Sequence, residues 1–497
     1  MSEASPEASS SEPSRSDLRP VPPLNLKTKL AYGAGDMGPA ITANLLVFFQ
    51  LVFFTNVAGL NAGLAGSVLM IGKVWDAVND PLVGMLSDRT RSARWGRRYP
   101  WMLYGAIPFG ITFFLQWIVP RFSTSVNQWG LFAYYVLMGI LFNTFYTMVN
   151  LPYTALTPEL THDYNERTSL NSFRFAFSIG GSILSLILAM VVFQVVVDAG
   201  QQYLWLSGIC AVISTLPLFW CVFGTYNRSR AMAALNLAPD SEAELPFLAQ
   251  LKIAFSNQPF LYVIGIYLCS WLAVQITAAV LPFFVVNCLG LSSQTFTQIA
   301  LTVQATALLM LFVWSAVSQR VGKKAVYFMG MALWIIAQAG LFFLQPEQSG
   351  LVYPLAILAG VGVSTAYLIP WSMIPDVIEL DELKTGQRRE GVFYGFMVLL
   401  QKLGLAVGLF VVGQALSRSG FIETVAGQPA PVQPASALTT IRFAIGPVPT
   451  VALILGLILA YFYPITREVH AEILLKLSER KRLAQPAERR FEEPESR

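Results

Sequence analysis

Two aspartates and a lysine lie inside a long apolar stretch of the sequence, at Asp76, Asp80 and Lys73. On a helix, residues spaced three and four positions apart project from one face. A charged side chain at the centre of a bilayer costs roughly 2.5–3.5 kcal/mol on insertion scales, so such residues face a protein interior and mark pathways. This charged stripe therefore predicts an ion or substrate site.

The residues around the two aspartates supply further oxygen ligands. Asn79 adds an amide oxygen between the carboxylates, and Pro81 leaves the Ala77 carbonyl without its helical partner. Carboxylate and carbonyl oxygens suit a hard cation, so we expect Asp76, Asp80 and Asn79 to bind Na+, with the two aspartates as its metal ligands. The cluster could instead bind a proton, because burial and a like charge disfavour ionisation. A purely structural ion pair would need one carboxylate for each lysine.

Two further basic residues fall within apolar segments, at Lys402 and Arg174. A lysine deep in a membrane needs a carboxylate partner. We expect Asp76 or Asp80 to provide it, which makes Lys402 a residue that couples the cation site to the rest of the protein. Lys73 and Arg174 are the other candidate coupling residues, although Arg174 could instead extend its charged end to the membrane interface.

Five residues are candidates for binding a substrate. Asp36 lies early in the first apolar segment, and Asn150 and Tyr153 flank a proline in the fourth. Tyr367 and Trp371 are four residues apart, so on a helix they share one aromatic face beside prolines that kink the segment. The alternatives are that Asp36 contacts a basic loop and that the aromatic side chains pack on neighbouring helices.

A cluster of acidic residues follows these aromatic residues, at Asp376, Glu379 and Asp381. It lies close to the basic loops expected on the cytoplasmic side. We expect it to form a latch with Arg97 or Arg98 that breaks when the protein opens inward.

The composition indicates the class of protein. The chain has 497 residues, of which 55% are hydrophobic and 12% charged, about half the charged fraction of a soluble domain. Its apolar runs are continuous over about 20 residues, which favours helices over barrel strands. We therefore predict an all-α polytopic membrane protein. Its twelve transmembrane helices lie near 31–57, 62–87, 101–120, 128–156, 170–197, 204–224, 259–286, 294–318, 325–344, 352–378, 392–416 and 440–463.

Basic residues concentrate in alternate loops, which places those loops and both termini in the cytoplasm. Similar basic turns follow the second and eighth spans, which indicates two related six-helix bundles around a central cavity, as in many secondary transporters. The predicted organisation has five parts. They are a disordered cytoplasmic tail (1–26), the first bundle (27–224), a cytoplasmic linker with an amphipathic helix (225–258), the second bundle (259–465) and a cytoplasmic tail (466–497).

The segment Trp75–Pro81 and the Trp95-Gly96-Arg97 turn resemble the glycoside–pentoside–hexuronide:cation symporter family of the major facilitator superfamily, over roughly 27–465. The resemblance implies the major facilitator fold, with Asp76 and Asp80 as the cation site. Lys402 and Arg174 match a lysine and an arginine on helices 11 and 5 of melibiose permease, a member of that family.

The match has one departure. The acidic sugar ligands of melibiose permease fall at Ala40 and Asn150, although Asp36 lies one turn from the former. The segment Pro370–Ile378 and the residues that follow Asp80 are also similar to sodium-dependent lysophosphatidylcholine symporters.

The expected function is that of a secondary active symporter, not an enzyme. It would couple a Na+ or H+ gradient to uptake of a small organic solute, a sugar or glycoside, by alternating access. A sodium-dependent lysophospholipid transporter is the alternative substrate class, and a membrane receptor or scaffold the alternative outside transport. We expect a monomer in the cell (inner) membrane, with substrate, a monovalent cation and the lipid bilayer as partners, no nucleic acid, and no cofactor beyond the co-transported ion.

Overall fold

The computed structural model describes residues 23–92, 94–120, 127–161, 164–234, 247–386, 389–425 and 431–484. Within these ranges the regular structure is helical, with two isolated backbone bridges, Ala58 to Val425 and Ser92 to Gly96. Most of the predicted N-terminal tail, the acidic part of the predicted linker and the last residues of the C-terminal tail lie outside the described residues.

The described residues of the first half form eight helices. They are α1 (Leu26–Ala34), α2 (Met37–Asn56), α3 (Ala62–Arg89), α4 (Tyr99–Leu115), α5 (Gln128–Thr154), α6 (Thr157–Leu160), α7 (Tyr164–Val195) and α8 (Ala199–Ala234). The helix α8 extends past residue 224, into the stretch predicted as linker.

The second half begins with the short helix α9 (Phe247–Ser256), within the stretch where an amphipathic helix is predicted. The others are α10 (Gln258–Phe283) with a π-helical turn (Phe284–Cys288), α11 (Ser293–Val321), α12 (Lys323–Phe343), a 3-10 turn (Pro346–Leu351), α13 (Val352–Thr385), α14 (Glu390–Arg418), α15 (Ala435–Ile445), α16 (Pro447–Phe462) and α17 (Arg467–Ala484).

Among the described residues, ten helical segments are long and apolar enough to cross a membrane, and α4 is a shorter apolar helix. The helix α3, which carries the charged stripe, completes the twelve predicted spans, each of which coincides with a helix or a broken pair of helices. The prediction of an all-α polytopic membrane protein is therefore confirmed. The last span breaks between α15 and α16 because Gly446 is non-helical and Pro447 has no N–H to continue the hydrogen-bond ladder.

The start of α3 is set by its N-cap. The Asn61 side chain accepts hydrogen bonds from the backbone N–H groups of Gly63, at 3.0 Å, and Leu64, at 3.4 Å. Such caps satisfy donors that have no partner inside the helix. The helix then runs unbroken through Pro81 to Arg89, so Asp76 and Asp80 lie near its middle.

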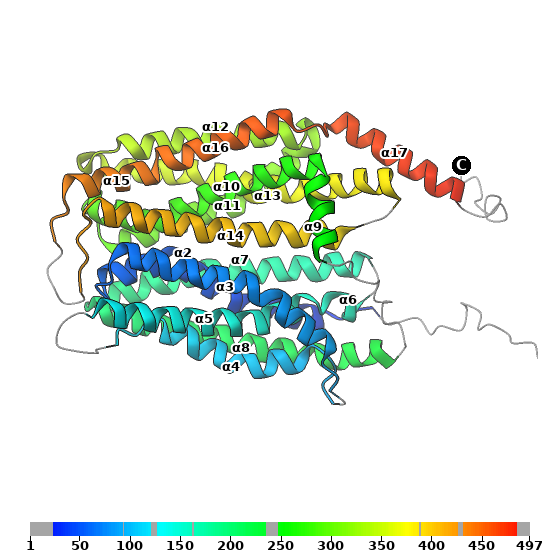
Figure 1. The fold of residues 1–497 in the computed structure, drawn as a ribbon, viewed down its shortest axis with the longest axis horizontal. Helices are drawn as coiled ribbons and strands as arrows, with labels where there is room; N and C mark the ends of the chain where they lie inside the picture. The colour runs from blue at the N-terminus through cyan, green and yellow to red at the C-terminus, as the bar shows by residue number, and fades with distance from the viewer. Residues whose placement is uncertain are drawn as a thin grey trace, which may run out of the picture.

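Figure 1 shows the helices α1–α8 in one layer and α10–α16 in a second layer, with α9 and α17 at the same end of the molecule as α6. The main contacts between the layers pair α3 with α14, α7 with α11 and α2 with α10. The helices α3 and α14 approach closely because each has a glycine where the two helices cross. A Cβ atom added to Gly66 would lie 3.0 Å from the Gly413 Cα atom, and small residues permit such approach in membranes.

Candidate cation and substrate site

A cluster of opposite charges joins the two halves at the middle of α3 and α14. The Lys402 ammonium lies 3.0 Å from Asp76 Oδ2 and 2.5 Å from Asp80 Oδ2. The Asp76 side chain is 2% exposed, whereas that of Asp80 is 27% exposed. One lysine from the second half therefore bridges two carboxylates of the first half, and any ion that neutralises those carboxylates competes with it.

A threonine of α5 completes this cluster. The Thr147 hydroxyl lies 3.2 Å from Asp76 Oδ1 and 3.0 Å from Asp80 Oδ1. A hydroxyl has one proton and two acceptor lone pairs, so Thr147 donates to one carboxylate at a time and can offer its oxygen to a cation. Sequence reasoning missed this residue because its closeness to the aspartates depends on how α5 packs against α3.

Lys73 and Asn79 lie at the edge of the cluster. The Lys73 ammonium is 3.9 Å from Asp76 Oδ2 and its side chain is 29% exposed. The Asn79 side chain donates to the Asn143 carbonyl at 3.5 Å, so its amide nitrogen faces α5. With Lys402 present, two lysines face two carboxylates, the ratio that a structural ion pair would require.

A second ion pair lies within the first half. The Arg174 Nε atom is 3.3 Å from Asp36 Oδ2, and its guanidinium lies 5.7 Å from the centre of the Tyr153 ring. The Tyr153 hydroxyl donates to the Tyr32 carbonyl at 2.9 Å, and the two rings stack. Arg174 therefore pairs with a carboxylate inside the bundle and does not extend to the membrane interface. Its partner Asp36 contacts this arginine and not a basic loop.

Asn150 has an unusual environment for a polar residue. Its Oδ1 atom is buried and has no hydrogen-bond partner among the described residues. A buried acceptor left without a donor costs about 1–3 kcal/mol. Asn150 therefore offers an acceptor to a bound molecule.

The predicted aromatic pair on α13 packs against aromatic residues of α10 and α14. Trp371 stacks with Tyr394 at 6.0 Å between ring centres, and Tyr367 meets Trp271 edge-on at 5.8 Å. Tyr367 and Trp371 are nevertheless 38% and 37% exposed. The Trp271 indole N–H is buried and has no hydrogen-bond partner in the part of the chain that the structure describes. The cluster therefore combines packed rings with open aromatic surface and a free donor.

At the ends of α3 and α14, hydrogen bonds tie the halves together. Glu423 accepts from the Ala62 N–H at 2.8 Å and from the Asn61 side chain at 3.1 Å. The Ser417 hydroxyl donates to Asn61 Oδ1 at 3.1 Å, and the Thr424 N–H donates to the Thr55 carbonyl at 2.9 Å. This network holds the N-terminus of α3 against the chain that follows α14.

Between the described residues, the ion pairs found do not join the acidic cluster of α13 to Arg97 or Arg98, so the expected latch is not seen in this conformation. Arg97 and Arg98 lie 3.0 and 3.4 Å from Glu159 of their own half. The acidic residues also find nearer cations in their own half: Asp376 pairs with Lys323 at 2.7 Å, and Asp381 pairs with Arg389 at 2.7 Å.

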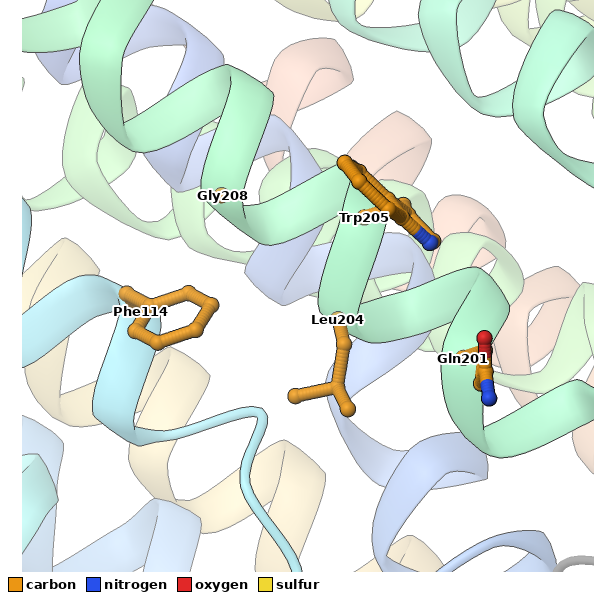
Figure 2. Close-up of a pocket in the computed structure, with 5 residues that line it drawn as sticks. All are labelled: Phe114, Gln201, Leu204, Trp205 and Gly208. Carbon is orange, nitrogen blue, oxygen red and sulfur yellow. The ribbon is translucent and has the colours of Figure 1, made fainter.

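A cavity of about 400 Å³ lies between α4 and α8, away from all of these clusters. Figure 2 shows Phe114 of α4 on one side of it and Gln201, Leu204 and Trp205 of α8 on the other. Trp205 is 59% exposed, so the cavity opens on the outer surface. It contains none of the predicted site residues.

Comparison with known proteins identifies the family. The family model described as "MFS/sugar transport protein" matches residues 31–467. The "Uncharacterized symporter sll1374" of Synechocystis sp. is 53% identical, with 92% of this chain and 97% of that protein aligned. The "Inner membrane symporter YicJ" of Escherichia coli is 28% identical, with 93% and 97% aligned. The mouse "Sodium-dependent lysophosphatidylcholine symporter 1" is 27% identical, with 90% and 86% aligned.

Solved structures agree with this assignment at the level of the fold. The xylose transporter XylE from E. coli, in a partially occluded inward-open conformation, superposes with a TM-score of 0.58 at 14% identity and covers 89% of this chain and 98% of its own. The major facilitator fold expected from the sequence is therefore confirmed. Since the family model spans nearly the whole membrane region, the chain belongs to the MFS/sugar transport protein family, the glycoside–pentoside–hexuronide:cation symporters, and is a cation-coupled symporter rather than an enzyme.

Proposed function

We propose that this symporter uses a Na+ or H+ gradient to drive uptake of a small organic solute, a sugar or glycoside, by alternating access. The observation that carries the proposal is the Lys402 bridge, because it links the two halves through the same carboxylates that would bind the ion. Both termini would lie in the cytoplasm and the protein would act as a monomer in the inner membrane.

Competition for these carboxylates provides the coupling. A cation bound by Asp76, Asp80 and the Thr147 oxygen replaces the positive charge of Lys402, which is then free to leave α3. A ligand can shift a conformational equilibrium only through different interactions with the two states. Here the cation stabilises the state in which the α3–α14 contact at mid-membrane is loosened, and its release restores the ion pair.

The solute would bind where polar and aromatic groups remain available. Asn150 offers an unpaired acceptor, and Trp271 an unpaired donor. The exposed faces of Tyr367 and Trp371 suit the apolar face of a sugar ring, while Asp36 and Arg174 could bind its hydroxyl groups. In major facilitator symporters of this plan, the substrate lies between the halves near the midplane.

A lysophospholipid is the second candidate substrate. Ala40 and Asn150 provide no carboxylate at the positions where melibiose permease binds sugar. The open aromatic surface of Tyr367 and Trp371 would suit an acyl chain or a choline headgroup equally well.

A thermal-shift screen of the purified protein against sugars and lysophospholipids, with and without Na+, separates the two substrates. Uptake into proteoliposomes with an imposed Na+ or H+ gradient then identifies the ion. Stabilisation by a sugar only when Na+ is present supports the proposal, and the same result with a lysophospholipid supports the second candidate.

A receptor or scaffold without transport is distinguished by Asp76→Asn and Asp80→Asn. Such a protein would not need charges at mid-membrane, so both variants would keep its function. Loss of gradient-driven uptake in both variants rejects that reading, whereas unchanged uptake and ion dependence reject the cation site.

A further inference from the structure

The C-terminal helix α17 packs against the end of α13, outside the membrane-spanning bundle. Its apolar residues Ile473 and Leu477 are 4% and 6% exposed and belong to the core of the second half. The Arg467 guanidinium donates to the Arg320 carbonyl at 2.8 Å. The helix is therefore docked on the protein through both apolar and polar contacts.

One histidine of α17 lies at the centre of this contact. The His470 Nε2 atom is 2.6 Å from Glu379 Oε2 and 3.4 Å from Asp376 Oδ1. Lys323 holds the same Asp376 from the other side, at 2.7 and 2.8 Å, and also donates to the Ser372 carbonyl at 2.6 Å. Four ionisable side chains from α12, α13 and α17 thus meet at one point.

The charges in this group balance only when the histidine is protonated. Asp376 and Glu379 carry two negative charges and Lys323 one positive charge, so a neutral His470 leaves one negative charge uncompensated. Several other charged side chains of these elements have partners outside this group: Lys324 bonds the Tyr461 carbonyl, Asp381 pairs with Arg389, and Lys476 pairs with Glu472. The remaining charged residues are Arg320 of α11, Glu382 and Lys384 of α13, and Arg467, Glu468, Glu479, Arg480, Lys481 and Arg482 of α17. Histidine is the side chain whose charge normally changes between about pH 5 and 8.

The contact acts on a helix that has a part in the proposed site. The helix α13 carries the aromatic residues Tyr367 and Trp371. Two prolines interrupt its hydrogen bonds on the way to Glu379: Pro370 lies between the aromatic residues and Pro375 follows them. Each proline removes a backbone hydrogen bond, so the end of α13 can bend relative to the aromatic segment. A contact that fixes this end therefore limits bending at the two prolines, and so fixes the angle between the end of α13 and the aromatic segment.

We propose that His470 is a pH-sensitive docking contact, through which protons on the α17 face of the membrane hold α17 against α13 and slow transport. Protonation completes the ion pairs with Glu379 and Asp376 and favours the docked helix. Deprotonation weakens both pairs and releases the end of α13. The regulation is distinct from proton or Na+ coupling, since His470 lies outside the membrane-spanning charge cluster.

Docking is measured directly by thiol labelling. Leu477→Cys places a thiol on the docked face, and the adjacent Ser478→Cys places one on the exposed face. The ratio of their maleimide labelling rates, followed by peptide mass spectrometry, corrects for the pH dependence of the reaction. We expect this ratio to rise several-fold from pH 6 to pH 8. Adding His470→Gln, or as a second variant Glu379→Gln, should make the ratio high and nearly independent of pH.

Glu472→Gln is the matched control on the same helix. The hydrogen bond from Lys476 lowers the pKa of the Glu472 carboxyl, so Glu472 stays ionised across this range and its removal should leave the pH response intact. An unchanged labelling ratio between pH 6 and 8 in the wild-type background, or a response that survives His470→Gln, overturns the proposal. Because labelling needs no substrate, these outcomes are independent of the proposed transport function.

Transport provides the second readout. In proteoliposomes with α17 facing a pH-clamped lumen and a fixed external pH, wild-type uptake should fall as the lumen is acidified from pH 8 to 6. Because a change in an H+ driving force would affect both proteins equally, the ratio of wild-type uptake to His470→Gln uptake should fall over this range. An equal fall in both proteins would show that the docking contact does not regulate transport.

Discussion

Replacement of Lys402 by methionine removes the charge that joins the halves while preserving much of the side-chain volume. At an effective dielectric constant of about 20, two unit charges 3.0 Å apart interact by about 5.5 kcal/mol. Desolvation offsets part of this, and breaking one side of a buried ion pair typically costs about 3–5 kcal/mol. We therefore expect Lys402→Met to lower the stability of the protein in ion-free buffer by about 3 kcal/mol.

The same variant should bind Na+ more tightly, because the ion no longer competes with an ammonium group for the carboxylates of Asp76 and Asp80. We expect at least about a tenfold gain in affinity, equivalent to about 1.4 kcal/mol. Saturating Na+ should then recover much of the lost stability, since a ligand at 100 times its dissociation constant contributes about 2.7 kcal/mol. Gradient-driven uptake should be lost, because the cation site is no longer linked to α14.

Sodium titrations followed by thermal shift give both quantities from one set of samples. Lys73→Gln is the matched control, since Lys73 lies 3.9 Å from one carboxylate, is 29% exposed and does not cross between the halves. It should change Na+ affinity much less. Unchanged or weaker Na+ binding by Lys402→Met would refute the idea that the lysine and the cation compete for one site.

Three further variants test other parts of the arrangement. Thr147→Val keeps the shape of the side chain but removes the hydroxyl, and should weaken Na+ binding by about tenfold in the same titration, as expected for a hydrogen bond or ligand at a charged group. Glu423→Gln removes a charge at the N-terminus of α3, worth about 0.3–1 kcal/mol, and should raise the labelling rate of Ser67→Cys from the outside. Arg174→Gln leaves the buried Asp36 unpaired and should lower the melting temperature, whereas adding Asp36→Asn should restore part of it.

Composition and hydrophobic length were sufficient to predict the membrane class and the twelve spans, because a bilayer requires each span to be long, apolar and internally hydrogen-bonded. The same constraint identified Lys73, Asp76, Asp80 and Lys402, since a charged side chain in an apolar segment is costly and indicates a partner or a functional site. These features depend only on the local sequence and its solvent, so no knowledge of the packing was needed.

The partners of those charges depend on distances between helices that are far apart in the chain. Thr147 reaches both aspartates only because α5 packs against α3. Lys402 meets them because the crossing of α3 and α14 is lined by Gly66 and Gly413. The expected latch failed for the same reason, because its acidic residues lie closer to cations of their own half than to Arg97 or Arg98.

The sequence by itself therefore determined that this is a polytopic helical transporter with a charged stripe at mid-membrane. The sequence also predicted Asp76 or Asp80 as the partner of Lys402. Only the tertiary structure decided that Lys402 contacts both carboxylates, that Arg174 pairs with Asp36, and that His470 contacts the end of α13. The physical reason is that an unpaired membrane charge can be recognised from its own cost, whereas its partner is chosen by the packing of whole helices.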